Sequence, residues 1–137
     1  MLTVIGLEKS FATDDGPLRV IDGVSFKVPD GECYALLGPS GSGKSTLLRV
    51  IAGFNRQQRG ELLVDGKDVS RVEPGARNIG MVFQSYALWP HMRVWDNVAF
   101  GLVERRINKE EIRRKVGAAL EMVGLSGYAE RRPNQLS

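Results

Sequence analysis

Hydrophobic residues form short runs in the first third of the chain and follow a helical spacing in the last third. The segments 18–21 and 24–28 are rich in β-branched and aromatic residues, and Pro29-Asp30-Gly31 after them is typical of a turn. Residues 33–37 are apolar without alternation, which indicates a strand buried on both faces of a parallel sheet. We therefore expect strands before and after this turn, with residues 33–37 at the centre of the sheet.

The middle of the chain predicts a helix and further strands. Residues 46–52 have a helical composition and are followed by Gly53, a common helix terminator. Residues 61–64 precede Asp65-Gly66, the strongest short signal for a tight hairpin turn. Residues 79–83 are expected to form one more strand.

Beyond Gln84 the pattern becomes helical. Asn108 and Glu111 have the spacing of a capping box at the start of a helix. Apolar residues then recur at helical spacing until Gly124, at Ile112, Val116, Leu120 and Val123. The change from β-rich to α-rich sequence predicts a β-rich core over residues 1–84 and an α-helical subdomain over residues 85–137.

Composition narrows the possible functions. The chain has 137 residues, 42% of them hydrophobic, which is enough to build a globular core. A net charge of +3 without a long run of like charges does not favour nucleic-acid binding. Cys33 is the only cysteine and is expected to be a small buried hydrophobe in a reducing compartment. The start of the chain lacks signal-peptide features, and no apolar run reaches the roughly 20 residues that cross a bilayer.

A phosphate loop is the clearest functional pattern. The pattern requires a Gly, four variable residues and then Gly-Lys-Ser or Gly-Lys-Thr. The residues that match it, together with the threonine that follows, are Gly38, Pro39, Ser40, Gly41, Ser42, Gly43, Lys44, Ser45 and Thr46. Glycines let the backbone approach an anion and turn its N–H groups inward. Lys44 is expected to reach the β- and γ-phosphates of a nucleotide, Ser45 to coordinate Mg²⁺, and Thr46 to contact the α-phosphate. The alternative is a glycine-rich turn with a solvated lysine, but an apolar run before and a helix after the loop favour nucleotide binding.

The flanking segments assign a family. The whole chain resembles the ATP-binding subunit of an ABC transporter, through residues 24–32 before the loop, residues 60–66 after it, and above all Gly80-Met81-Val82-Phe83-Gln84-Ser85-Tyr86-Ala87-Leu88-Trp89-Pro90-His91. This last segment is similar to the family's Q-loop. The resemblance implies an α/β fold, with a P-loop NTPase core, an antiparallel β subdomain and the start of an α-helical subdomain.

Two further site residues come from the resemblance. Gln84 falls at the Q-loop glutamine, which in the family touches the Mg²⁺ and water around the nucleotide; the alternative is a polar strand end. Phe11 aligns with the aromatic residue that stacks on adenine, although tyrosine or tryptophan is common there; the alternative is a core aromatic. The resemblance thus implies ATP and Mg²⁺ as cofactors, with Ser45 and Gln84 as the metal-binding residues.

The last residues resemble the start of the family's signature sequence. Leu136 and Ser137 match its first two positions, and the Walker B aspartate, the catalytic glutamate and the switch histidine would follow downstream. We therefore expect an incomplete ABC ATPase that binds ATP but does not hydrolyse it by itself. The missing strands would leave sheet edges unpaired, which predicts poor solubility of the isolated chain.

The resemblance also implies partners and a location. The segments 87–91 and 94–102 look most like the branch that energises the uptake of sugars, polyamines, ferric iron or organophosphonates. Such a subunit contacts membrane-spanning subunits through the Q-loop region, pairs head to tail with a second ATPase subunit, and lies at the cytoplasmic face of the bacterial inner membrane. The alternatives are a non-catalytic nucleotide-binding fragment and a soluble ABC ATPase of DNA repair or translation. A small GTPase or a kinase is disfavoured because no Asn-Lys-x-Asp sequence occurs.

Other conspicuous residues are interpreted without catalytic roles. Residues 62–65 imitate a Walker B strand, but Gly66 makes Asp65 a turn residue. His91 is expected to contact a partner, since a lone histidine is seldom a metal site. Trp89 and Trp95 are expected to pack or to anchor an interface.

Overall fold

The computed structural model describes residues 1–85 and 87–136, which form two compact units. The first unit spans Met1–Met81 and the second Val82–Ser137. The division lies between Met81 and Val82, whereas the boundary expected from the sequence follows Gln84. All the strands of the described chain, together with the phosphate loop, belong to the first unit.

The first unit contains an antiparallel sheet. Its strands are β1 (Leu2–Thr13), β2 (Gly16–Val28), β3 (Arg59–Val64) and β4 (Lys67–Asp68), in the order β2-β1-β3-β4. The predicted hairpin at Asp65-Gly66 is confirmed, because both residues have positive φ angles, of 51° and 75°, as a two-residue hairpin turn requires. The two runs predicted at 18–21 and 24–28 are parts of one long strand, β2. Strand β1 has no counterpart among the strands predicted from the sequence.

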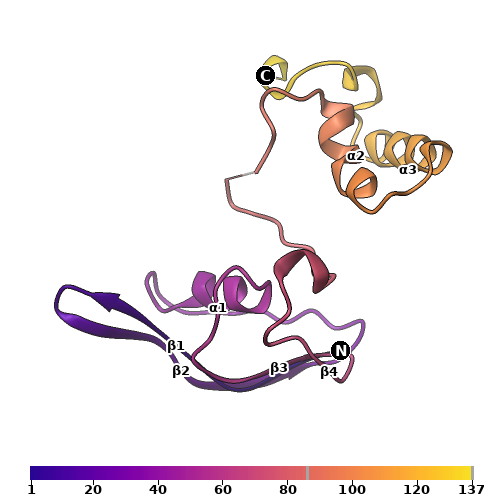
Figure 1. Cartoon of the computed structure of the whole chain (residues 1–137). Helices are drawn as coiled ribbons and strands as arrows, with labels where there is room; N and C mark the ends of the chain where they lie inside the picture. Colours follow the sequence, from indigo (N-terminus) through magenta and orange to yellow (C-terminus); the bar gives the residue numbers. More distant parts are fainter. Residues whose placement is uncertain (86, 137) are drawn as a thin grey trace. The chain divides into compact units, whose positions relative to one another are not determined.

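The hairpin of β1 and β2 extends beyond the end of β3 (Figure 1). The β1–β2 pairing runs from Leu2 opposite Val28 to Thr13 opposite Gly16, with irregularities along β1. On its other edge, β1 pairs with β3 only as far as Glu8, which lies opposite Arg59. The distal part of β1, which carries Phe11, therefore has a strand neighbour on the β2 side alone within the described sheet.

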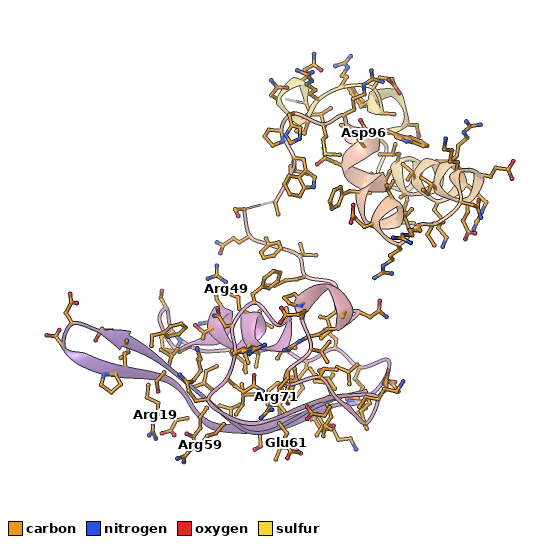
Figure 2. All side chains as sticks on the ribbon, viewed as in Figure 1. Arg19, Arg49, Arg59, Glu61, Arg71 and Asp96 are labelled. Atoms are coloured by element: carbon orange, nitrogen blue, oxygen red, sulfur yellow. The ribbon has the colours of Figure 1, made fainter. Side chains whose placement is uncertain are left out.

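Helix α1 (Lys44–Ile51) packs on one face of the sheet. Its residues at positions i, i+3 and i+4, Leu47, Val50 and Ile51, are buried, as expected for the apolar stripe of a helix on a core. They share that core with sheet residues that include Val4, Leu7, Ile21 and Leu62. The opposite face of the sheet carries charged side chains, among them Arg19, Arg59 and Glu61 (Figure 2). The predicted helix at 46–52 is confirmed, and it begins two residues earlier than expected, at Lys44.

Two predicted strands are absent from the described sheet. Residues 33–37 and 79–83 are assigned no strand. Leu37 is 91% exposed and Val82 is 98% exposed, and Cys33 is exposed instead of buried. A segment becomes a strand only when a neighbouring backbone pairs with it in a ladder, and the ladders of the described sheet join β1, β2, β3 and β4 alone. Their apolar composition thus indicated burial that this chain does not supply by itself.

The second unit is helical. It contains α2 (Val94–Glu104), α3 (Lys109–Met122) and short 3₁₀ turns at Ser126–Tyr128 and Pro133–Gln135; a further 3₁₀ turn, Pro74–Ala76, lies in the first unit. Val94 and Ala99 of α2 are buried together with Val116 and Leu120 of α3. Within residues 1–85 and 87–136, no helix has the length and apolar character needed to cross a bilayer.

The start of α3 was predicted correctly. The Asn108 side chain accepts a hydrogen bond from the Glu111 backbone N–H at 2.9 Å, which satisfies one free donor of the first helical turn. The Glu111 carboxylate, which a capping box would direct back toward Asn108, instead accepts a hydrogen bond from Lys115 Nζ at 3.1 Å. Of the apolar residues predicted to face the core, Val123 is 63% exposed and lies outside it.

Candidate functional site

The phosphate loop turns directly into α1. Gly43 is the residue that precedes the helix, and its φ angle of 88° lies in the left-handed region that glycine adopts readily. A Cβ at this position would lie 2.8 Å from the Val20 carbonyl oxygen of β2. Only glycine therefore allows the end of the loop to rest against β2.

The Lys44 ammonium group lies over the loop that precedes it. Lys44 Nζ donates hydrogen bonds to the carbonyl oxygens of Gly38 at 2.8 Å and Pro39 at 2.6 Å, and to Ser42 Oγ at 3.2 Å. These contacts hold a positive charge at the mouth of the loop. An anion in the loop would meet this charge without a large movement of the lysine stem.

The start of α1 is open to an anion. The first helical hydrogen bond runs from the Leu47 N–H to the Gly43 carbonyl oxygen at 2.8 Å, so the N–H groups before Leu47 lie ahead of the helical hydrogen-bond series. In the part of the chain that the structure describes, no side chain caps this end and no acidic residue lies in the first turn. The partial positive charge of the helix start, about half an elementary charge, is thus left uncompensated by the helix itself.

A hollow of about 510 Å³ joins the loop to the distal part of β1. Its lining residues are Phe11, Val20, Ser40, Gly41, Ser42, Gly43, Lys44, Ser45 and Thr46. The structure therefore brings the predicted aromatic residue and the predicted loop to one hollow. Gly38 and Pro39 instead line a neighbouring hollow of about 380 Å³, with Leu36 and Leu37.

Sequence reasoning missed two residues next to Phe11 and the loop. Val20 lines the hollow and supplies the carbonyl oxygen against which Gly43 rests. Lys9 places its Nζ 4.9 Å from the centroid of the Phe11 ring, within the range of a cation–π contact. The spacing of Lys9 and Phe11 becomes informative only once β1 is known to be a strand, in which residues i and i+2 lie on the same face. No sequence signal pointed to Val20, which looks like any apolar strand residue.

The predicted metal-binding residues are both exposed. Ser45 lines the hollow, whereas Gln84 belongs to the second unit. Within residues 1–85 and 87–136, no group of three or more His, Cys, Asp or Glu side chains is placed to hold a metal ion. The Ser45 hydroxyl beside a bound phosphate is compatible with Mg²⁺, which commonly takes one or two protein ligands together with phosphate oxygens and water.

The residues interpreted as non-catalytic have ordinary structural surroundings. Asp65 occupies the β3–β4 turn and its carboxylate contacts the Met1 ammonium group. The Trp89 ring lies 5.4 Å from that of Phe100 and 6.4 Å from that of His91, measured between ring centroids. Trp95 packs against the core of the second unit, as predicted. Tyr86 and Ser137, which belong to the Q-loop and signature resemblances, lie outside the described residues.

A glycine-rich loop, a lysine over that loop and an uncapped helix start together define a phosphate-loop nucleotide-binding protein. The family model for ABC transporters matches residues 21–137. The chain belongs to the ABC transporter family, which confirms the family and the partial α/β fold predicted from the sequence.

Similar proteins are named as import ATP-binding proteins. The chain is 47% identical to the spermidine/putrescine import ATP-binding protein PotA of Acidothermus cellulolyticus, over 96% of this chain and 34% of that protein. It is 55% identical to the sulfate/thiosulfate import ATP-binding protein CysA of Mycobacterium bovis, over 89% of this chain and 35% of that protein. It is 47% identical to the sn-glycerol-3-phosphate import ATP-binding protein UgpC of Bordetella pertussis, over 99% of this chain and 37% of that protein. The chain thus spans about a third of the length of these relatives.

A solved structure has the same fold. The ATP-binding cassette MJ0796, described as a dimer in a post-hydrolysis state bound to ADP and Pi, superimposes with a TM-score of 0.88 at 28% identity. The match covers 100% of this chain and 63% of that one.

Proposed function

We propose that this chain binds ATP with Mg²⁺ at the phosphate loop, as part of the ATP-binding subunit of a bacterial solute importer. The observation that carries the proposal is the hollow shared by the loop and Phe11, with the Lys44 ammonium over the loop. The names of PotA, CysA and UgpC as import ATP-binding proteins support the importer class. Because these relatives are named for chemically different solutes, the resemblance defines the class of importer and no single solute.

The residues of the hollow divide between the two ends of the nucleotide. The amides of residues 40–45 would surround the phosphates, Lys44 would neutralise charge on the β- and γ-phosphates, and Thr46 would contact the α-phosphate. Ser45 would hold the metal ion, whose role is to neutralise phosphate charge. Phe11 would stack on the base, since a flat apolar ring accepts any base face.

For Gln84, the proposal rests on the resemblance of its segment to the Q-loop. The Gln84 amide would contact the metal ion or its water without adding charge, and the segment around it would respond to the nucleotide. The exposed aromatic cluster of Trp89, His91 and Phe100 begins shortly after Gln84 in sequence and ends in α2. We propose that this region contacts the membrane-spanning subunits.

The whole protein is proposed to work as a pair. MJ0796 is described as a dimeric cassette. The proposed assembly is a head-to-tail pair with a second ATPase subunit. This pair would be attached peripherally to the cytoplasmic face of the inner membrane through its membrane partners.

A comparison of two ligands tests the division of the hollow. Binding of ATP and of tripolyphosphate, each with Mg²⁺, is measured by calorimetry on the chain and on its Phe11→Ala variant. Loss of base stacking is expected to weaken ATP binding by about tenfold while tripolyphosphate binding stays unchanged. Phe54→Ala, which removes an exposed aromatic residue outside the hollow, serves as the matched control. Equal ATP affinities for Phe11→Ala and the wild type would contradict the assignment of Phe11.

A further inference from the structure

The edge of β1 that faces β3 changes partner shortly before Phe11. Backbone pairing with β3 reaches Glu8, opposite Arg59. The Gln58 N–H then donates to the Glu8 carbonyl oxygen at 2.9 Å, from the residue that precedes β3. Beyond this point, the support for β1 on the β3 side comes from a side chain.

The Gln58 side-chain amide pairs with the backbone of Ser10 in both directions. Gln58 Oε1 accepts the Ser10 N–H at 2.9 Å, and Gln58 Nε2 donates to the Ser10 carbonyl oxygen at 2.8 Å. A primary amide presents a donor and an acceptor side by side, as a residue of a neighbouring strand does. Gln58 therefore extends the β1–β3 ladder by one step past Arg59, the first residue of β3.

The contact between Gln58 and Ser10 lies at an irregular step of the β1–β2 pairing. The β1–β2 register shifts between Lys9 and Ser10, so the pairing with β2 is irregular at this step. Phe11 follows directly, pairs with Leu18 and lines the hollow. The direction of the Phe11 side chain depends on the backbone of Ser10 and Phe11, because successive strand residues point to opposite faces.

We propose that Gln58 is a positioning residue for the base-binding side of the site: through Ser10 it holds β1 so that Phe11 faces the hollow. Gln58 lies outside the hollow and acts only through the strand. This inference rests on the proposed binding of ATP. It adds a determinant that lies in the segment between α1 and β3, outside the phosphate-loop motif.

The adjacent residue supplies a matched control. The Gln57 side chain is directed elsewhere: its Nε2 donates to the Ser70 carbonyl oxygen at 3.5 Å. Gln57→Met and Gln58→Met make the same chemical change one position apart, and methionine keeps the length of the side chain. Only Gln58→Met removes the amide that pairs with Ser10.

The experiment joins a binding measurement to amide hydrogen exchange on the 137-residue chain. Gln58→Met is expected to weaken binding of Mg²⁺-ATP by about fivefold. The reason is that β1 becomes less ordered near Ser10, which weakens the stacking of Phe11 on the base and leaves the phosphate contacts as they are. Binding of Mg²⁺-tripolyphosphate is expected to stay at the wild-type value, and exchange of the Ser10 amide is expected to accelerate at least tenfold. Gln57→Met is expected to leave all three quantities unchanged.

A second variant, Gln58→Glu, tests the same hydrogen bonds without introducing a methionine side chain. Gln58→Glu has the shape of glutamine but, when ionised, only accepts hydrogen bonds, so it cannot donate to the Ser10 carbonyl oxygen. It is expected to weaken ATP binding in the same direction as Gln58→Met. Unchanged Ser10 exchange in both variants, or an equal loss of ATP and tripolyphosphate binding, would overturn the proposal. A wild-type chain that binds neither ligand would overturn the proposed function instead, and Ser10 exchange would still decide whether Gln58 holds the strand.

Discussion

Gly43 and Val20 are in such close contact that a Cβ on Gly43 would lie 2.8 Å from the Val20 carbonyl oxygen. The contact joins the end of the phosphate loop to β2, the strand that pairs with the Phe11 segment of β1. The two ends of the proposed nucleotide site are thus held by one hairpin. The geometry of the loop depends on the sheet as well as on its own glycines.

Gly43→Ala is predicted to abolish this contact and to distort the loop. The new methyl group would clash with a backbone atom that cannot rotate away, and alanine at a φ angle of 88° adds strain. Binding of Mg²⁺-tripolyphosphate, measured by calorimetry, is expected to weaken by at least about tenfold. Gly41→Ala is the control, because Gly41 has a similar φ angle of 81° and no atom within 4 Å of the added Cβ. Equal effects of the two substitutions would show that the contact with Val20 is unimportant.

Arg77 is predicted to stabilise the end of α1. This residue is only 4% exposed, and its guanidinium group donates hydrogen bonds to the carbonyl oxygens of Val50 and Ile51, both at 2.9 Å. Burial lowers the pKa of Arg77, yet a guanidinium stays charged at any ordinary pH, so its positive charge faces the negative end of the α1 dipole.

Arg77→Met is expected to lower the stability of the first unit by about 2 kcal/mol, because it removes the side-chain donor of the Ile51 carbonyl group and leaves the Val50 carbonyl group with the Gly53 N–H alone. Hydrogen exchange of the α1 and β3 amides would measure the change. Arg71→Met removes an exposed arginine from the same segment (Figure 2) and is expected to change the stability by less than about 0.5 kcal/mol. Similar exchange rates in the two variants would contradict the role of Arg77.

The cap of α3 gives a local prediction for the second unit. Asn108→Ala removes the acceptor of the Glu111 N–H and is expected to destabilise α3 by about 1 kcal/mol. Exchange of the amides in the first turn of α3 would report the change. Asn134→Ala, at an exposed position outside the helix, should leave those rates as they are. A faster exchange in Asn134→Ala than in Asn108→Ala would refute the assignment.

Glu111 makes the stability of α3 depend on pH. The hydrogen bond from Lys115 holds the pKa of the Glu111 carboxyl group below its usual value. A group whose pKa is lower in the folded state stabilises that state above the pKa of the unfolded chain, and the contribution is lost as the pH falls through the lower, folded value. The protection of α3 amides, relative to their intrinsic exchange rates, should therefore fall on acidification. Glu111→Gln should show a smaller fall, and an identical pH profile for the variant would contradict this assignment.

Local sequence signals predicted the elements whose stabilising contacts are local. Asn108 and the Asp65-Gly66 turn were recognised because their hydrogen bonds and φ angles involve neighbouring residues. The strand assignments at residues 33–37 and 79–83 were wrong because a strand depends on a pairing partner, and hydrophobicity alone does not supply one. Gln58 could not have been predicted, since its amide pairs with Ser10, a residue far away in sequence that only the fold brings close.

The phosphate loop is the element of the site that the sequence specified best, since its residue order is itself the pattern. The most direct measurement is a titration of the chain with labelled ATP in the presence of Mg²⁺, repeated on Lys44→Ala and on Lys67→Ala, which removes an exposed lysine of β4. Lys44→Ala is predicted to weaken binding by at least about tenfold, and Lys67→Ala to bind as the wild type does. Equal affinity of Lys44→Ala and the wild type, with both chains folded by circular dichroism, would contradict the account.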